Sequence, residues 1–267
     1  MLITLTTDFD YRDPFVGIMK GAITGINPRA QVIDLTHGIP PQDVMAGALS
    51  LSHAVPYFPR GTIHVVVVDP GVGGTRRAIL IESAGNYFVG PDNGVLSLAV
   101  AGANPDHVIE LSNVAYQLKA TGSTFHGRDI FAPAAAHLSL GVPAGVFGAQ
   151  LSSFVELSLP DIRRERGRWE GEIIYIDSYG NLFTNLAERD LTGVAARDLC
   201  FAVGSTMIEG IEKSYDAVEA ARLVAVWNSW GLLEIAVNMG SAQQSCKAKI
   251  GDRVVVTAGS RSSGGTK

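Results

Sequence analysis

The chain has 267 residues, of which 46% are hydrophobic and 18% are charged. This composition is typical of a folded protein, and the length allows one large domain or two unequal ones. The 21 basic and 26 acidic residues give a formal net charge of -5, which argues against a nucleic-acid-binding or anionic-membrane-binding protein. No basic leader or membrane-length apolar run is visible, so we expect a cytoplasmic protein with a small-molecule ligand.

The first part of the chain alternates short β-branched runs with amphipathic stretches, the pattern of a largely parallel α/β domain. Residues 63–68 are almost continuously apolar, which indicates a strand buried on both faces by flanking helices. We expect this domain to cover residues 1–160. Its strands are expected over 2–6, 31–36, 62–69, 78–83 and 86–90.

Amphipathic segments between these runs predict the helices of the domain. Asp13 and Pro14 have the residue types of an N-cap and a first helical position, and apolar residues then recur at helical spacing to about Gly25. The other helices are expected over about 42–54, after Asn93 and after Asp129.

The character of the sequence changes near residue 160. The charged run over 161–168 is interpreted as a linker, and the Gly/Ser-rich end over 261–267 as a flexible tail. Between them, residues 169–260 contain short apolar runs separated by Gly, Asn, Ser and Asp, which predict a smaller antiparallel β-barrel domain. The runs lie at 171–177, 181–186, 199–204, 222–229, 232–239 and 252–257.

Polar loops follow the predicted strands, where parallel sheets bind their ligands. Four segments are candidates, and they contribute Asp8, Asp10 and Asp13; Asp69, Arg76 and Arg77; Asp92 and Asn93; and His126, Arg128 and Asp129. Helix capping by Asp13, and turn formation by Asp8 and Asp10, are alternative roles for these carboxylates. The glycines of GVGGT lack the spacing of a nucleotide-phosphate loop.

An acidic pocket with a histidine and an arginine allows more than one chemistry. It could hold Mg²⁺ for phosphoryl transfer, or it could attract an organic cation. The sequence has neither the nucleophile elbow of serine hydrolases nor a His-Glu-x-x-His zinc motif, so hydrolases of those kinds fit poorly.

Seven motifs, in order along nearly the whole chain, carry a resemblance to a known family. The chain resembles the S-adenosyl-L-methionine hydroxide adenosyltransferases, which belong to the same superfamily as the S-adenosylmethionine-dependent fluorinase and chlorinase. The motifs are TTDF (6–9), DPFVGIMKG (13–21), VDPGVG (68–73), GPDNG (90–94), TFHGRDIFAPAAA (124–136), IDSYGNLFTN (176–185) and NSWGLLEIAVN (228–238).

The resemblance implies an enzyme that hydrolyses S-adenosylmethionine to adenosine and L-methionine, with water attacking C5′ of the ribose. The family's hydrolytic triad falls on Asp69, Arg76 and His126. In the halogenases the positions of Asp69 and His126 carry tyrosines, and that of Gly127 can carry a serine. Two like charges about 4 Å apart repel by roughly 4 kcal/mol at an effective dielectric near 20, so Asp69 favours water over a halide anion.

Further roles are also implied by matching positions in the family. Asp8 is expected to bind the ribose hydroxyls, Asp13 and Asp177 the methionine ammonium, and Asn181 the adenine. The resemblance also places Phe125 and Tyr179 against the nucleoside and Ser229 near the methionine end of the substrate. It implies no metal and no cofactor, and a homotrimer with its sites at subunit interfaces.

Three positions depart from the family pattern, and other functions stay open. Asp10 replaces a glycine, Tyr179 replaces a phenylalanine, and Trp230 stands where the halogenases have an arginine that would face the methionine carboxylate. A halogenase of the same superfamily, a nucleoside-binding protein with little turnover, and a Mg²⁺-dependent phosphohydrolase are the alternatives to a hydrolase of S-adenosylmethionine.

Overall fold

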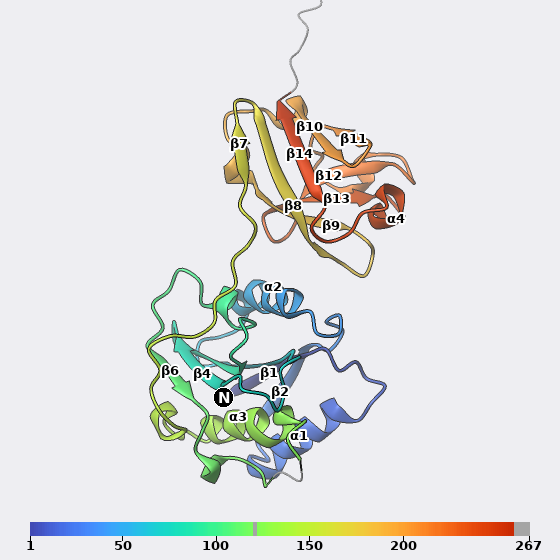
Figure 1. Cartoon of the computed structure of the whole chain (residues 1–267). Coiled ribbons are helices and arrows are strands. Elements are labelled where there is room, and N and C mark those ends of the chain that lie inside the picture. The colour runs from blue at the N-terminus through green and yellow to red at the C-terminus, as the bar shows by residue number, and fades with distance from the viewer. Residues whose placement is uncertain (120–121, 259–267) are drawn as a thin grey trace, which may run out of the picture. The chain divides into compact units, whose positions relative to one another are not determined.

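Figure 1 shows the computed structural model of the chain, which describes residues 1–119 and 122–258. The chain divides into two compact units, Met1–Leu157 and Ser158–Lys267. The expected tail over 261–267 lies outside the described residues. In the described part of the chain no helix is both long and apolar enough to cross a membrane.

The first unit contains a six-stranded sheet in the order β2-β1-β3-β5-β4-β6. Strands β1, β2, β3 and β5 are mutually parallel, and β4 runs antiparallel to both β5 and β6, so the predicted mostly parallel sheet is confirmed. The strands are β1 (Leu2–Thr7), β2 (Gln31–Thr36), β3 (Ile63–Val67), β4 (Ala78–Ser83), β5 (Asn86–Pro91) and β6 (His107–Glu110). The sequence patterns predict all of these except β6, which is too short to show a period.

Helices cover both faces of this sheet, with α1 and α3 on one side and α2 on the other (Figure 1). They are α1 (Phe15–Ile26), α2 (Val44–Ala54) and α3 (Ala132–Ser139), and a π-helical turn, η4 (Gly127–Phe131), leads directly into α3. Apolar residues of β1 and β3, including Ile3, Leu5 and Val65, are fully buried against Met19 of α1 and Phe131 before α3. This core fixes the strand ends at which the polar loops begin.

Two details of the predicted helices are wrong. Pro14, not Asp13, is the N-cap of α1, and no side chain caps the first turn, which leaves the Asp13 carboxylate available elsewhere. The segment after Asn93 forms only a 3-10 turn, η2 (Ser97–Ala99). Gly94 has a positive φ of 97°, and the Ser97 hydroxyl bonds back to its carbonyl, so this segment folds as a tight turn rather than as a helix.

The second unit is the predicted antiparallel, barrel-like domain. Its strands follow the order β11-β10-β14-β8-β9-β13-β12, and β7 pairs with β8. They are β7 (Arg163–Glu165), β8 (Arg168–Ile176), β9 (Leu182–Ala187), β10 (Leu199–Val203), β11 (Thr206–Glu209), β12 (Leu223–Trp227), β13 (Leu232–Val237) and β14 (Arg253–Ala258), with the short helix α4 (Ala242–Cys246). Inward-facing residues such as Trp169, Phe201 and Val254 form its core.

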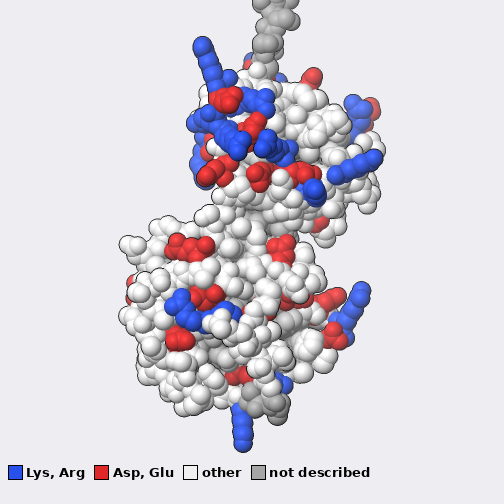
Figure 2. Space-filling model, in the orientation of Figure 1, with Lys and Arg blue, Asp and Glu red and all other residues white. Residues whose placement is uncertain are grey.

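Most of the expected linker over 161–168 belongs to a hairpin. Strand β7 pairs antiparallel with β8, and Gly167 takes the positive φ of 71° that the turn between them requires. All of β7 is exposed, so its charged composition carries no apolar signal of a strand. On the face shown in Figure 2, acidic and basic side chains are intermixed.

The remaining short helical turns connect these elements. They are η1 (Val55–Tyr57), η3 (Val114–Tyr116), η5 (Ala144–Val146), η6 (Glu188–Leu191), η7 (Ala196–Asp198) and η8 (Tyr215–Ala217).

Candidate active site

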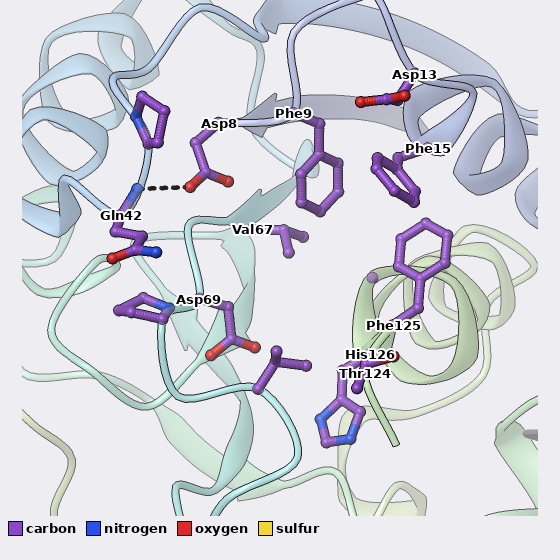
Figure 3. Close-up of a pocket in the computed structure, with 14 residues that line it drawn as sticks. Asp8, Phe9, Asp13, Phe15, Gln42, Val67, Asp69, Thr124, Phe125 and His126 are labelled. Carbon is purple, nitrogen blue, oxygen red and sulfur yellow. Dashed lines mark hydrogen bonds between the residues drawn. The ribbon is translucent and has the colours of Figure 1, made fainter. Parts of the chain in front are cut away.

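A pocket of about 400 Å³ lies at the edge of the first unit's sheet where β1, β2 and β3 end. Loops after all three strands and the residues before η4 form its wall (Figure 3). The lining residues are Asp8, Phe9, Asp13, Phe15, Pro41, Gln42, Val67, Asp69, Pro70, Val72, Thr124, Phe125, His126 and Gly127. Three of the four predicted loops therefore meet, and the fourth, which carries Asp92 and Asn93, does not line the pocket.

Asp69, Arg76 and His126, which the sequence analysis places in one triad, are joined by hydrogen bonds. Arg76 Nε donates to Asp69 Oδ1 at 2.9 Å, and Arg76 Nη2 contacts Asp69 Oδ2. Arg76 Nη2 also lies 2.6 Å from His126 Nδ1. The side chains of Asp69 and Arg76 are 5% and 11% exposed, so this ion pair is largely shielded from water.

The contact with Arg76 determines where the proton of His126 lies. A guanidinium group only donates hydrogen bonds, so Nδ1 of His126 must accept, and the proton of the neutral ring is on Nε2. Burial and the nearby charge of Arg76 lower the pKa of His126, while Asp69 and Asp129 oppose this shift. The ring is therefore neutral at pH 7 and presents an N–H donor at Nε2.

Glycines allow the loop after β3 to place Asp69 and Arg76 together. Gly73 has a φ of 75°, and a Cβ there would lie 2.7 Å from the carbonyl oxygen of Ser123. At Gly71 a Cβ would lie 3.3 Å from Cγ of Arg76. The glycines of GVGG thus serve close packing of this loop against the segment before His126.

The opposite wall combines carboxylates with aromatic rings. Asp8 Oδ2 accepts a hydrogen bond from the backbone N–H of Gln42 at 2.8 Å, and Asp13 and Phe15 stand at the same wall (Figure 3). The rings of Phe9, Phe15 and Phe125 contact one another, with centroids 5.3–5.9 Å apart. This wall offers acceptors for hydroxyl or ammonium groups beside an apolar surface.

Pro41 and Gln42 are pocket residues that the sequence analysis missed. They lie in the loop between β2 and α2. Because β2 is parallel to β1, the loop after β2 begins at the same sheet edge as the loop that carries Asp8. This parallel pairing was the signal that could have identified Pro41 and Gln42.

Two of the proposed polar loop groups have structural roles instead. Asp92 binds Arg77 and the backbone N–H of Val155, and Asn93 bonds to the carbonyl of Val68 and the N–H of Val95. Arg128 pairs with its neighbour Asp129, which is 3% exposed. These pairs stabilise the loops, because their polar atoms are already bound within the protein.

Asp177, Tyr179, Asn181 and Ser229 belong to the second unit. Asp177 Oδ1 accepts from the backbone N–H groups of Tyr179 and Asn181, and its Oδ2 accepts from Asn181 Nδ2 at 3.0 Å. These bonds bring Asp177 and Asn181 together in the turn between β8 and β9. In the same turn Tyr179 is 77% exposed. Ser229 lies exposed in the turn between β12 and β13.

A buried acid in the second unit was also missed. Glu234 of β13 is 1% exposed and accepts a hydrogen bond from Tyr215 Oη at 2.7 Å. Burial raises the pKa of Glu234, and the charge of Asp177 raises it further. The signal was a single glutamate inside an otherwise apolar strand pattern.

The comparisons with known proteins agree with these features. Models of the SAM hydroxide adenosyltransferase N-terminal and C-terminal domains match residues 3–148 and 171–255. A (R)-S-adenosyl-L-methionine hydrolase from Salinispora arenicola is 36% identical, over 96% of this chain and 98% of its own. A fluorinase from an Actinoplanes species is 26% identical, over 96% and 97%.

A solved structure is similar across both units. The crystal structure of an uncharacterized conserved protein from Thermotoga maritima has a TM-score of 0.89 and 35% identity, and the match covers 96% of this chain and 100% of that one. Because the family models together cover most of the chain, the chain belongs to the SAM hydroxide adenosyltransferase family.

Proposed function

We propose that this protein hydrolyses S-adenosylmethionine to adenosine and L-methionine. The hydrogen-bonded group of Asp69, Arg76 and His126 at the pocket is the observation that carries the proposal. Relatives with 36% and 37% identity over nearly the whole chain are named (R)-S-adenosyl-L-methionine hydrolases, which supports the same substrate and the same sulfonium epimer here.

In the proposed mechanism, Asp69 and His126 hold one water molecule. The Nε2–H group of His126 donates a hydrogen bond to the water oxygen, and Asp69 accepts a hydrogen bond from the water. Arg76 fixes both side chains, because its guanidinium binds the Asp69 carboxylate and His126 Nδ1 together. This arrangement directs an oxygen lone pair at the carbon under attack.

The bonds change in a single displacement. A bond forms between the water oxygen and C5′, the bond between C5′ and sulfur breaks, and its electron pair stays on sulfur. Sulfur thereby changes from a sulfonium cation to the neutral thioether of methionine, so no acid is needed to protonate the leaving group. The proton lost by water passes to Asp69 and then to solvent.

Substrate contacts are proposed for the carboxylates and rings around the pocket. Asp8 would accept from the ribose hydroxyls and Asp13 from the methionine ammonium, while Phe125 would pack against the nucleoside. Asp177, Tyr179, Asn181 and Ser229 of the second unit are proposed to contact the ammonium, the nucleoside, the adenine and the methionine end.

The structure alters the electrostatic argument against a halide. Asp69 is paired with Arg76, so the repulsion of an anion is smaller than the estimate for an isolated carboxylate. Preference for water then depends on the donor and acceptor that His126 and Asp69 offer to one molecule. A halogenase would make a 5′-halo-5′-deoxyadenosine when chloride or fluoride is added, and we expect adenosine alone.

Labelled water tests the reaction. In ¹⁸O water the label should enter the 5′-hydroxyl of adenosine and not methionine, as mass spectrometry of the separated products would show. Unlabelled adenosine would contradict attack of water at C5′. Each sulfonium epimer should be supplied separately, and we expect turnover of the (R) form.

We further propose a homotrimeric cytoplasmic enzyme that needs no metal or cofactor and binds no nucleic acid, with its sites at subunit interfaces. Chelation with EDTA should leave the rate unchanged, and a loss restored by Mg²⁺ would favour a phosphohydrolase instead. Subunit sharing is tested by reassembling inactive Asp69→Ala and Asp177→Ala chains together. Activity near a quarter of wild type is expected after random mixing, and no recovery despite subunit exchange would contradict shared sites.

A further inference from the structure

We propose that the side chains of Thr7, His37 and Asp34 form a connected row that positions the substrate-binding loop over residues 8–13. The inference deepens the proposed function and rests on it, because Asp8 and Asp13 of this loop are its proposed substrate contacts. None of the three residues lines the pocket, so they act as positioning residues and not as catalytic ones.

The three side chains are in contact with one another. Thr7 Oγ1 and His37 Nδ1 are 2.8 Å apart, and His37 Nε2 lies 3.1 Å from Asp34 Oδ1, a close contact without the angles of a hydrogen bond. Thr7 is fully buried and His37 is 2% exposed. Asp34 Oδ2 accepts from Lys20 Nζ of α1 at 2.6 Å and from Tyr11 Oη of the loop at 2.9 Å.

The direction of the contacts in this row follows from the charge of Asp34. Partial burial raises the pKa of Asp34, but its contacts with Lys20, His37 and Tyr11 outweigh this and lower the pKa, so the carboxylate is ionised at neutral pH. A carboxylate favours an N–H facing it, so Nε2 is the nitrogen of His37 that carries a proton toward Asp34. Thr7 Oγ1 lies within hydrogen-bond distance of Nδ1, and the same oxygen accepts from the backbone N–H of Phe9 at 3.2 Å.

The same residues connect the loops after β1 and β2. The backbone N–H of Asp10 donates to the carbonyl of His37 at 2.9 Å. Asp10 has a φ of 55°, which non-glycine residues adopt uncommonly. The backbone N–H of Gln42 binds Asp8 itself. Since Asp10 takes an uncommon backbone conformation and Asp8 lies between Thr7 and Phe9, these contacts from outside the loop help to hold its shape.

A second threonine–histidine pair on the same strand provides an internal control. Thr4 Oγ1 lies 2.8 Å from His64 Nδ1, and both residues are fully buried. His64 packs against Phe58 and Phe88. Its partner Thr4 lies earlier in β1 than Thr7 and therefore farther along the strand from the loop over residues 8–13. The two pairs share their chemistry, but only that of Thr7 is linked to a carboxylate and to the substrate loop.

The test separates positioning from stability through the steady-state constants. Asp34→Asn and Thr7→Val should raise KM for S-adenosylmethionine about tenfold while kcat stays within about threefold, because the altered residues act on substrate contacts and not on the attacking water. Thr7→Ser, which keeps the hydroxyl, should restore KM. The control Thr4→Val should lower the melting temperature and leave KM unchanged.

Two substitutions of His37 test its contact with Asp34 and its contact with Thr7 separately. A glutamine amide reaches the place of Nε2 and can face Asp34, whereas an asparagine amide reaches that of Nδ1 and can face only Thr7. We expect His37→Asn to raise KM as Asp34→Asn does, and His37→Gln to raise it less. Equal KM values for wild type, Asp34→Asn and Thr7→Val, with only melting temperatures reduced, would overturn the inference.

Binding of adenosine separates this inference from the proposed function. Calorimetry should show weaker adenosine binding to Asp34→Asn than to Thr4→Val, whether or not the wild type turns over. If the wild type makes no adenosine but these affinities still differ, the hydrolase proposal fails and the positioning role stands. If Thr7→Val does not fold, Asp34→Asn at its partly exposed position decides the question.

Discussion

Arg76 and Arg77 are adjacent in the sequence, and each pairs with an aspartate that follows a strand of the same sheet. Arg77 binds Asp92 and the carbonyl of Ser153, and the second oxygen of Asp92 accepts from the N–H of Val155. Arg76 binds Asp69 and also His126, and both partners line the pocket. The same kind of ion pair thus has its acceptors filled by protein groups in one place. In the other place its partners face a cavity, where we propose that they act on water.

The largest expected effect comes from Asp69→Asn. The amide keeps the shape of the side chain but loses the charge that binds Arg76 and accepts from water, so kcat should fall by about 100- to 1000-fold. Initial rates at saturating S-adenosylmethionine would measure it, and calorimetry with adenosine should show nearly unchanged affinity. A loss confined to affinity would show that Asp69 only binds substrate.

Arg76→Lys and Arg77→Lys compare the two clusters directly. A lysine cannot bridge a carboxylate and an imidazole with a rigid fork, so Arg76→Lys should reduce kcat by about 10- to 100-fold. Arg77→Lys should leave kcat within about twofold. Similar losses in both variants would mean that the loop as a whole, rather than the bridge to His126, controls the rate.

Asp92→Asn should affect stability and not catalysis. Asp92 is 6% exposed and its hydrogen bonds hold the segment around Val155, so we expect the free energy of unfolding to fall by about 2 kcal/mol. Urea denaturation followed by fluorescence gives this value. An unchanged midpoint would show that the Arg77 pair contributes little to folding.

The smallest effect concerns pH. Because burial and the charge of Arg76 lower the pKa of His126, its neutral form persists below the ordinary value, and kcat/KM should fall only at pH values below about 6.5. Arg76→Gln removes the cation, so the pKa should rise and the acid limb should move to higher pH. Arg77→Gln should not move it, and equal shifts in both variants would contradict the assignment of this limb to His126.

The same shift has a consequence for stability. The unfolded chain binds a proton at His126 at a higher pH than the folded chain does, so the contribution of this residue is complete above the unfolded pKa. It decreases as the pH falls toward the lowered folded value.

Much of the architecture follows from local patterns in the sequence. Continuous apolar runs such as 63–68 identify buried strands, and their order with amphipathic segments predicts the parallel sheet, because hydrophobic periodicity is a local property. The motifs around Asp69 and His126 also predicted residues that the structure brings together. Strand β7 was missed because its residues are all exposed and carry no apolar period. The amphipathic pattern after Asn93 wrongly predicted a helix, because the positive φ of Gly94 makes a tight turn there.

Only the tertiary structure decided how the candidate polar groups are paired. Asp69 and Asp92 both follow strands of the sheet, and the strand pattern treats them alike, although the family resemblance singles out Asp69. In the fold Asp69 lines the cavity, whereas Asp92 binds Arg77 and the N–H of Val155. The proton position on His126 and the linkage of Thr7 to Asp34 through His37 likewise depend on contacts between distant residues. A hydrogen bond depends on distances and angles in space, and spacing along the chain does not encode these until the sheet has brought its loops together.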